Sequence, residues 1–255
     1  MEDLENNIEE CAVYGNDEDE LTTAAKQREL DKLEEFEVYE IVPEEQSFGK
    51  KRVTTRWEIA HRLDGVRARF VAREFKRGEY MDVVFAPSSG HSTSRIVDYI
   101  ALKKGYHTLT GDVTNAFLHV PEDEECYVDP PKEWLAKRSA LGLTLKVTWK
   151  LKKQLYGRRR AGTRWVDFFA ALLTDCNMTR CEVAPQFFMD YDRDIFLEVH
   201  MDDIHAAGTE KALASLKTEL DKTVQFKVWE VHAPGTTYEH LKRIRTLKHG
   251  ITEIE

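Results

Sequence analysis

The sequence predicts an α+β protein, because strands and helices interleave irregularly rather than alternating as in a doubly wound parallel sheet. Strand-like runs with turn signals occupy much of residues 37–75 and 187–208, whereas apolar stripes at helical spacing occur at residues 163–174. With 255 residues and 42% hydrophobic content, the chain can bury a substantial core in one or two domains. It contains neither a signal peptide nor a run of about 18 apolar residues, so we expect no export and no membrane span.

In chain order, the pattern predicts a helix over 21–36, strands over 37–42, 53–62 and 66–75, a helix over 92–104, strands over 106–112, 126–129 and 145–151, a helix over 163–174, a hairpin over 187–208, a helix over 209–224, and strand and turn over 237–255. Asp64-Gly65 is a strong hairpin signal. Ser92-Thr93-Ser94 can cap the second helix and Gly105 can end it. Thr209 suits the N-cap of the last helix.

Periodicity also assigns side chains to faces. Helical spacing directs four side chains of residues 163–174 inward: Trp165, Phe168, Phe169 and Leu172. Strand alternation places Arg67, Arg69 and Arg73 on one face, which makes the second strand of the hairpin basic on that side.

Charge is distributed unevenly along the chain. The net charge is −9, yet residues 1–45 hold 17 acidic and 3 basic residues, leaving 29 acidic and 34 basic residues in the other 210. Residues 1–20 are polar and acidic, and we expect them to be disordered. Residues 134–166 contain no acidic residue and ten basic ones: Lys137, Arg138, Lys146, Lys150, Lys152, Lys153, Arg158, Arg159, Arg160 and Arg164. Such a stretch is typical of a surface that binds a polyanion, although it can also be a basic face exposed to solvent.

The four cysteines are Cys11, Cys126, Cys176 and Cys181, and none forms a CxxC pair. This pattern indicates an intracellular, reduced protein with ordinary buried thiols rather than zinc ligands.

The residues that carry most functional information are two adjacent carboxylates, Asp202 and Asp203, at the tip of the otherwise apolar hairpin. Like charges this close raise each other's pKa unless a cation neutralises them. Mg²⁺ prefers carboxylate oxygens. Asp112 follows a separate apolar strand, and if the fold brings it beside the pair, the three carboxylates form a two-metal site for phosphoryl transfer. The alternative is a β-turn that uses Asp for its geometry.

Six motifs, in order, resemble the reverse transcriptase of copia-type retrotransposons over roughly residues 36–252. They are Arg67-Ala68-Arg69-Phe70-Val71-Ala72-Arg73 (family KARLVAR), Val84-Phe85-Ala86-Pro87 (TFAP), Asp112-Val113-Thr114-Asn115-Ala116-Phe117-Leu118 (DVKTAFL), Tyr127-Val128-Asp129-Pro130-Pro131 (YMEQP), Leu155-Tyr156-Gly157 through Trp165 (LYGLKQAPRAW) and His200-Met201-Asp202-Asp203 (YVDD).

The resemblance implies a polymerase palm, an antiparallel sheet backed by helices, with a fingers subdomain and most of the thumb missing. Residues 1–20 would be a leader, 21–45 a helix and strand leading into the fingers, and 46–252 the fingers and palm. It implies that Asp112, Asp202 and Asp203 are the catalytic carboxylates and bind two Mg²⁺ ions.

Other roles are implied for residues that bind substrate. Phe117 would lie under the incoming sugar and exclude a 2′-hydroxyl, or else simply pack in the core. Arg67, Arg69 and Arg73 would face the triphosphate or the template backbone, or form a solvated strand face. Tyr238 and Leu241-Lys242 resemble the hairpin that holds the primer end.

The chain departs from the family pattern at three positions. His200 replaces Tyr, Arg160 stands where the family has Gln, and Gly162 where it has Pro. In the family, the segment that corresponds to the one containing Arg160 shapes the pocket under the nascent base pair. His200 and His205 could contribute to a metal cluster, but strand alternation predicts that they lie on opposite faces.

We therefore expect an RNA-directed DNA polymerase domain that takes a primed RNA or DNA template and deoxynucleoside triphosphates. Its other partners would be the remaining domains of a retrotransposon polyprotein, and its location intracellular, in cytoplasmic particles or the nucleus. The alternatives are a truncated or decayed copy that binds nucleic acid through residues 134–166 without catalysis, and an unrelated two-metal nuclease or phosphatase.

Overall fold

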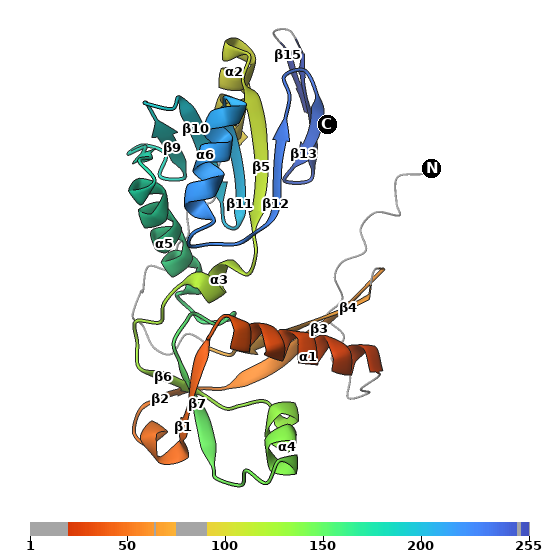
Figure 1. The fold of residues 1–255 in the computed structure, drawn as a ribbon, viewed down its shortest axis with the longest axis vertical. Helices are drawn as coiled ribbons and strands as arrows, with labels where there is room; N and C mark the ends of the chain where they lie inside the picture. The colour runs from red at the N-terminus through yellow and green to blue at the C-terminus, as the bar shows by residue number, and fades with distance from the viewer. Residues whose placement is uncertain (1–19, 64, 75–90, 249–250, 255) are drawn as a thin grey trace. The chain divides into compact units, whose positions relative to one another are not determined.

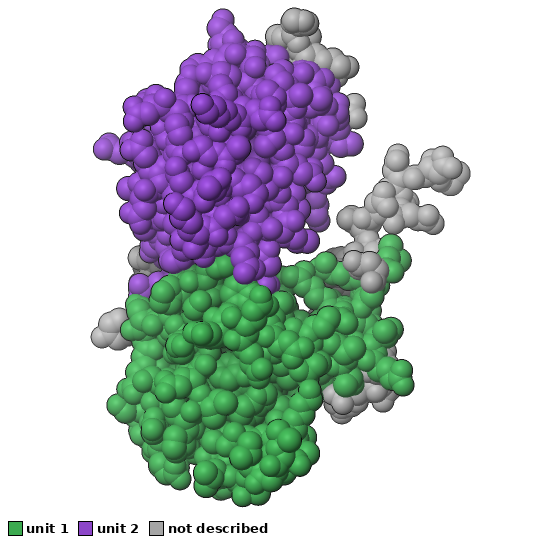
Figure 2. All heavy atoms as spheres, in the orientation of Figure 1, with its two compact units in different colours: residues 1–82, 117–161 green, residues 83–116, 162–255 purple. Residues whose placement is uncertain are grey.

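The computed structural model describes residues 20–63, 65–74, 91–248 and 251–254. The chain divides into two compact units, each of which is described by itself (Figure 2). Unit 1 comprises residues 1–82 and 117–161, and unit 2 comprises residues 83–116 and 162–255. The leader 1–20, apart from its last residue, and Val84-Phe85-Ala86-Pro87 lie outside the described residues, as do Cys11, Asp64 and Gly250.

The helices are α1 Glu20–Glu35, the short 3-10 helix η1 Glu44–Ser47, α2 His91–Lys104, α3 Ala116–His119, α4 Lys132–Ala140, α5 Ala161–Asp175 and α6 Glu210–Leu220 (Figure 1). The strands are β1 Tyr39–Pro43, β2 Lys51–Val53, β3 Thr55–Arg62, β4 Gly65–Ala72, β5 His107–Val113, β6 Cys126–Val128, β7 Val147–Leu151, β8 Thr179–Arg180, β9 Phe187–Asp190, β10 Ile195–His200, β11 Asp203–Gly208, β12 Phe226–His232, β13 Thr237–His240, β14 Arg243–Lys248 and β15 Ile251–Ile254. The predicted α+β class is confirmed.

Unit 1 is built on a four-stranded sheet of order β1-β7-β6-β2 and on the β3–β4 hairpin. Its core is centred on Trp149, which is 1% exposed and stacks on Tyr39 at 3.6 Å between ring centroids. Phe70 and Trp134 meet the same indole edge-on, at 5.8 and 5.3 Å. These aromatic contacts join both sheets of the unit through large buried rings.

A buried arginine organises the polar side of unit 1. The guanidinium of Arg158 contacts Glu74 at 2.9 Å, Glu122 at 3.0 Å and Glu124 at 3.3 Å, and its side chain is only 4% exposed. Burial alone would lower the pKa of Arg158, but the hydrogen bond to Glu122 and the surrounding carboxylates hold it above the ordinary value. Arg158 is therefore neutralised inside the protein, although it belongs to the one-signed stretch 134–166.

The glycine before this arginine allows β4 to approach closely. Gly157 has φ +79°, and a Cβ built there would lie 2.1 Å from the carbonyl oxygen of Ala72. In the same place the amide of Ala72 donates to the carbonyl of Tyr156 at 2.7 Å. Only glycine fits both the left-handed backbone and the contact.

Unit 2 contains an antiparallel six-stranded sheet of order β12-β5-β11-β10-β9-β8 and the three-stranded sheet β13-β14-β15. Helix α2 packs on one face, where Val97 and Ala101 join Ala207 of β11 in one hydrophobic cluster. Helix α6 covers the other face, where Leu213 meets Gly208 (Figure 1). Thr209 caps α6 as predicted, accepting a hydrogen bond from the amide of Ala212 at 3.3 Å.

Some elements differ from the prediction. β12 and α4 were not expected, and β12 is important because it pairs with β5. In α5, Trp165 and Phe169 are buried as predicted, but Phe168 and Leu172 are only partly buried. Leu173, which was not predicted to face inward, is fully buried. The helix also starts earlier than predicted, at Ala161. Among the described residues, no helix combines the length and the apolar character needed to cross a membrane.

We expect Gly157→Ala to lower the free energy of unfolding by about 3 kcal/mol or more, because it combines backbone strain with a backbone clash. The matched control is Gly142→Ala, since Gly142 has φ +75° but no atom within 4 Å of its built Cβ. That control should cost about 1–2 kcal/mol, the price of the left-handed conformation alone. Denaturant unfolding measures both values, and equal losses would contradict the predicted contact with Ala72.

Candidate active site

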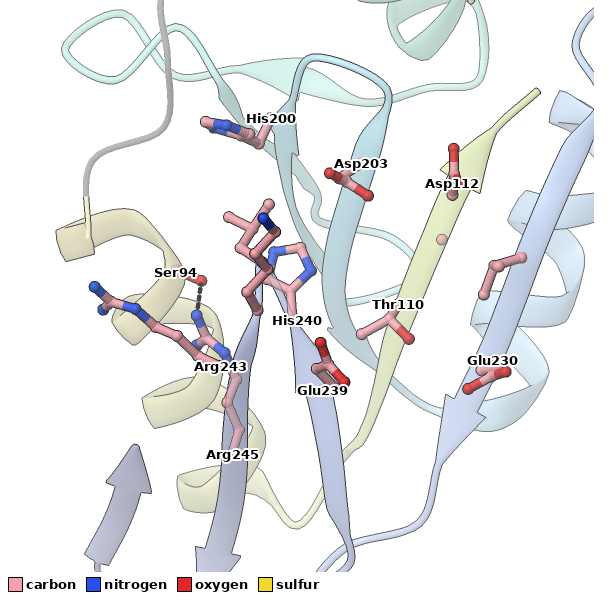
Figure 3. Close-up of a pocket in the computed structure, with 14 residues that line it drawn as sticks. Ser94, Thr110, Asp112, His200, Asp203, Glu230, Glu239, His240, Arg243 and Arg245 are labelled. Atoms are coloured by element: carbon pink, nitrogen blue, oxygen red, sulfur yellow. Dashed lines mark hydrogen bonds between the residues drawn. The ribbon is translucent and has the colours of Figure 1, made fainter. Parts of the chain in front are cut away.

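The structure brings together two of the predicted carboxylates through strand pairing. β5 and β11 are antiparallel neighbours in which Asp112 lies directly opposite Asp203. Residues directly opposite each other in such a pair share a face, with Cβ atoms about 4.5–5.5 Å apart. Asp203 is also opposite His200 in β10, so all three side chains share one sheet face, which we call the carboxylate face (Figure 3).

Asp202 belongs to the two-residue loop that joins β10 to β11. Met201, its partner in the loop, has φ +57°, a left-handed conformation that is unusual for a residue with a side chain. Two hydrogen bonds hold this loop: Trp165 Nε1 donates to the carbonyl of Met201 at 2.7 Å, and the amide of Val113 donates to the carbonyl of Asp202 at 2.8 Å. The second bond ties Asp202 to the end of β5, next to Asp112.

Electrostatics at the site reflect the crowding of negative charge. Burial, followed by the neighbouring charges of Asp202 and Asp112, raises the pKa of Asp203 to about 6, while His200 opposes the shift. Lys227 contributes a compensating charge, with its Nζ 3.9 Å from Asp112 Oδ2. It lies where the β12–β5 register shifts, between Phe226 and Val228. The site therefore has the property expected of a cation-binding group of oxygens.

A cavity of about 670 Å³ opens on the carboxylate face. Asp112, His200 and Asp203 line one part of it (Figure 3). Leu241 and Lys242, from the turn between β13 and β14, line another part. Both turn residues have positive φ, 52° and 58°, which matches a type I′ turn built without glycine or asparagine. A strained turn at a cavity is typical of a functional site.

Gly111 positions Asp112, a role the sequence did not reveal. A Cβ at Gly111 would lie 2.6 Å from Cγ1 of Ile204, a side chain that is fully buried. Gly111 and Ile204 are opposite each other in the β5–β11 pair, on the face away from the carboxylates. The absence of a side chain at Gly111 therefore permits the close packing of the two strands that carry Asp112 and Asp203.

The prediction that His200 and His205 lie on opposite faces is wrong. Alternation holds along one strand, but the two-residue loop separates the two histidines. Because His200 pairs with Asp203, and His205 follows two residues later in β11, both rings lie on the carboxylate face. His205 lies beside other groups, Glu198 and His240, rather than in a cluster with His200 and Asp202.

The remaining predicted residues belong to unit 1. Arg67 and Arg69 lie in β4 on one face, and Arg73 follows just after its end. Partial burial, together with Arg69 and Arg62, lowers the pKa of Arg67. The guanidinium of Arg69 stacks on the ring of Tyr156 at 5.1 Å.

Phe117 and Arg160 are also in unit 1 and remain accessible. Phe117 is half-buried in α3, with its ring edge-on to Tyr156 at 5.3 Å between centroids. Arg160 is 44% exposed and lies 3.7 Å from Glu124. Neither side chain is part of a fully buried core.

In metal-free protein, Asp203 should make stability fall as pH rises from about 4 to 6. Its pKa in the folded state is higher than the ordinary 3.8, so between these two values the folded protein binds the proton more tightly than the unfolded chain does. This contribution to the free energy of unfolding is lost when the pH rises above the pKa of the folded state. Asp203→Asn should abolish the fall in stability between pH 4 and 6 and raise the Tm at pH 7.5. Thermal unfolding in a chelator measures this. A lower Tm for Asp203→Asn at pH 7.5 would contradict the proposed repulsion.

We expect Gly111→Ala to destabilise the sheet by about 1–3 kcal/mol through overpacking against Ile204. Gly208→Ala is the control, because its built Cβ meets no atom nearer than 3.4 Å. The double substitution Gly111→Ala with Ile204→Ala should show a favourable coupling free energy, which a double-mutant cycle measures. Strict additivity would rule out the contact as the cause.

Comparison with known proteins identifies the family of the chain. The family model described as "Reverse transcriptase (RNA-dependent DNA polymerase)" matches residues 36–234. The chain is 27% identical over 217 residues to the retrovirus-related Pol polyprotein from transposon TNT 1-94 of Nicotiana tabacum, covering 80% of this chain and 16% of that protein. The chain thus spans about a sixth of the length of this curated relative.

Two solved structures match over most of this chain. Apo telomerase from Candida tropicalis, truncated from its C-terminal domain, matches with a TM-score of 0.51 and 9% identity over 92% of this chain and 60% of that one. The foamy viral protease-reverse transcriptase in complex with double-stranded DNA matches with a TM-score of 0.48 and 12% identity, covering 90% and 34% of the two chains. Since the family model spans most of the sequence, the chain belongs to the reverse transcriptase (RNA-dependent DNA polymerase) family, in its copia-type retrotransposon branch.

Proposed function

We propose that this chain is a working RNA-directed DNA polymerase domain that adds deoxynucleotides to a primer 3′-hydroxyl on an RNA or DNA template. The observation that carries the proposal is the β5–β11 register, which places Asp112 opposite Asp203 beside a cavity large enough for substrate groups. Family membership supports the reaction type, and the carboxylates supply the chemistry that nucleotidyl transfer needs.

The carboxylates fit a divalent metal. Burial, and after it the negative charges of Asp202 and Asp112, raises the pKa of Asp203, and Lys227 approaches Asp112 no closer than 3.9 Å. In our proposal Asp112, Asp202 and Asp203 hold two Mg²⁺ ions. When bound, these ions lower the pKa of the primer hydroxyl and neutralise phosphate charge. The protein's own contribution is to hold the three carboxylates in fixed positions through β5, β11 and the strained loop.

The side chains of unit 1 would contact the nucleotide and template. Arg67, Arg69 and Arg73 would bind triphosphate or template phosphates. Burial, and after it the positive charges of Arg69 and Arg62, lowers the pKa of Arg67, and an anion bound there would relieve the repulsion between these charges. Phe117, which is partly exposed, would exclude a ribose 2′-hydroxyl. Arg160 would contribute to the pocket under the nascent base pair.

In unit 2, the turn between β13 and β14 would hold the primer end. The strained residues Leu241 and Lys242 line the same cavity as Asp112 and Asp203, which supports this role. Tyr238 would act indirectly, because it is buried and donates a hydrogen bond to Asp98 at 2.7 Å rather than facing substrate.

The domain would act with a primed template, deoxynucleoside triphosphates and the other domains of a retrotransposon polyprotein. We place the domain inside the cell, in cytoplasmic particles or the nucleus. We assign residues 1–20 to a leader, residues 21–45 to a helix-and-strand segment, and residues 46–252 to the fingers and palm. The alternative, a copy that binds nucleic acid without turnover, has no structural observation in its favour, since all three carboxylates are present.

Primer extension on poly(rA)/oligo(dT) with Mg²⁺ tests the proposal. We expect labelled product from the unsubstituted chain and a loss of roughly 10²-fold to 10³-fold or greater in Asp202→Asn, because a preorganised charge is removed with little change in volume. Asp175→Asn is the control: Asp175 is an exposed aspartate at the end of α5, and its substitution should leave activity unchanged.

Two results would decide against polymerisation by this site. Near-normal activity of Asp202→Asn would exclude the assigned carboxylates. Template binding by a folded, unsubstituted chain that yields no product would favour the non-catalytic alternative.

A further inference from the structure

A second cluster of ligand groups lies on the carboxylate face, apart from the three aspartates. Glu198 of β10 and His205 of β11 are opposite each other in their strand pair, and His240 ends β13. All three residues are buried, and one ligand atom of each lies within 4.8 Å of the others. The rings of His205 and His240 stack at 4.7 Å between centroids.

Two of these groups carry buried polar atoms that have no hydrogen-bond partner among the residues that the structure describes. They are Oε2 of Glu198 and Nε2 of His240. The other carboxylate oxygen of Glu198 is satisfied, since it accepts a hydrogen bond from Thr93 Oγ1 at 2.6 Å. A buried polar atom left unpaired costs about 1–3 kcal/mol, so two at one place call for a ligand.

The third group, His205, directs the lone pair of Nδ1 toward Glu198. Tyr238 donates its single hydroxyl proton to Asp98 at 2.7 Å. His205 Nε2, 2.9 Å from the tyrosine oxygen, must therefore be the donor in that contact. In the neutral ring this leaves Nδ1 unprotonated, and Nδ1 lies 3.9 Å from Glu198 Oε2, with Ser94 Oγ at 3.4 Å.

The local charge favours a cation. Arg245 is paired with Asp98 and donates to Ser94 Oγ at 2.7 Å (Figure 3), so its charge is balanced. The ring of His205 lies 3.9 Å from Glu198 Oε2, and in its neutral form that ring adds no positive charge to balance the carboxylate.

We propose that Glu198, His205 and His240 bind one divalent transition-metal ion of the zinc type, separate from the magnesium site of the aspartates. Zn²⁺ binds well to two imidazole nitrogens and one carboxylate oxygen, whereas Mg²⁺ prefers a set of oxygen ligands only. Metal bonds of about 2.0–2.2 Å place ligand atoms roughly 3.4 Å apart, so binding would draw the three side chains together by about 1 Å.

The surrounding residues provide the outer contacts that such a site needs. Thr93 orients the carboxylate of Glu198, and the chain from Asp98 through Tyr238 to His205 fixes the tautomer of that ring. The ion would tie β13 to β10 and β11. Because His240 lines the cavity and immediately precedes Leu241 and Lys242, the ion would also hold the strained turn in place.

Zinc titration of metal-free protein tests the site. Asp203→Asn serves as the background, because it weakens the aspartate site. We expect one equivalent of Zn²⁺ to bind, measured calorimetrically, with a rise in Tm, and Co²⁺ in its place should give a ligand-field absorption spectrum. In the same background, Glu198→Gln and His240→Ala should each lower the affinity by about 100-fold or more, since loss of an outer contact alone costs 10–100-fold.

His107→Ala is the matched control, a histidine of the same sheet outside the cluster, and it should bind zinc normally. Glu198→Gln keeps the side-chain shape and the contact with Thr93, so it decides the matter if His240→Ala does not fold. Failure of the background protein to bind zinc, or equal affinity in Glu198→Gln, would overturn the proposal and leave a proton as the cluster's only cation. Zinc affinity and Tm are measured without polymerisation, so the zinc site and the proposed polymerase activity can each be disproved without affecting the other.

Discussion

The antiparallel register between β5 and β11 is the constraint on which the site depends. It places Asp112 and Asp203, distant in the sequence, on adjacent strands and on one face. A slip of one residue would turn Asp203 to the opposite face. The register is held by the bond from Val113 to Asp202 and by the close contact between Gly111 and Ile204, so side chains behind the site control the geometry in front of it.

The two faces of this sheet divide stability and function between them. On the face away from the carboxylates, Leu109, Ile204 and Ala206 are fully buried and contribute apolar packing. On the carboxylate face, the same strands present Asp203 and His205, whose charge and lone pairs need partners. Strand alternation allows this division, because adjacent residues in one strand face different environments. The apolar packing offsets the cost of holding like charges and strained turns together.

The β13–β14 hairpin links the two groups of ligand atoms on the carboxylate face. Its turn lines the cavity of the aspartates, while His240, at the start of the turn, belongs to the nitrogen-containing cluster. Arg245 of the same hairpin pairs with Asp98 of α2. The hairpin is therefore anchored by these buried polar contacts, which fix orientation specifically, and by Tyr238 and Leu247 in the hydrophobic cluster that contains Val97 and Ala101 of α2.

From the sequence alone, the α+β class and most helices and strands could be predicted, and the three carboxylates could be selected as candidate metal ligands, because these inferences follow from local periodicity and from motifs that are contiguous along the chain. It did not reveal β12, whose position depends on pairing with β5, nor the packing role of Gly111. It also misplaced His205, since alternation cannot be counted across a tight loop. The lone pairs of Glu198, His205 and His240 converge only in the tertiary structure. Their convergence could not be predicted, because it requires strands from distant parts of the chain to meet in one register.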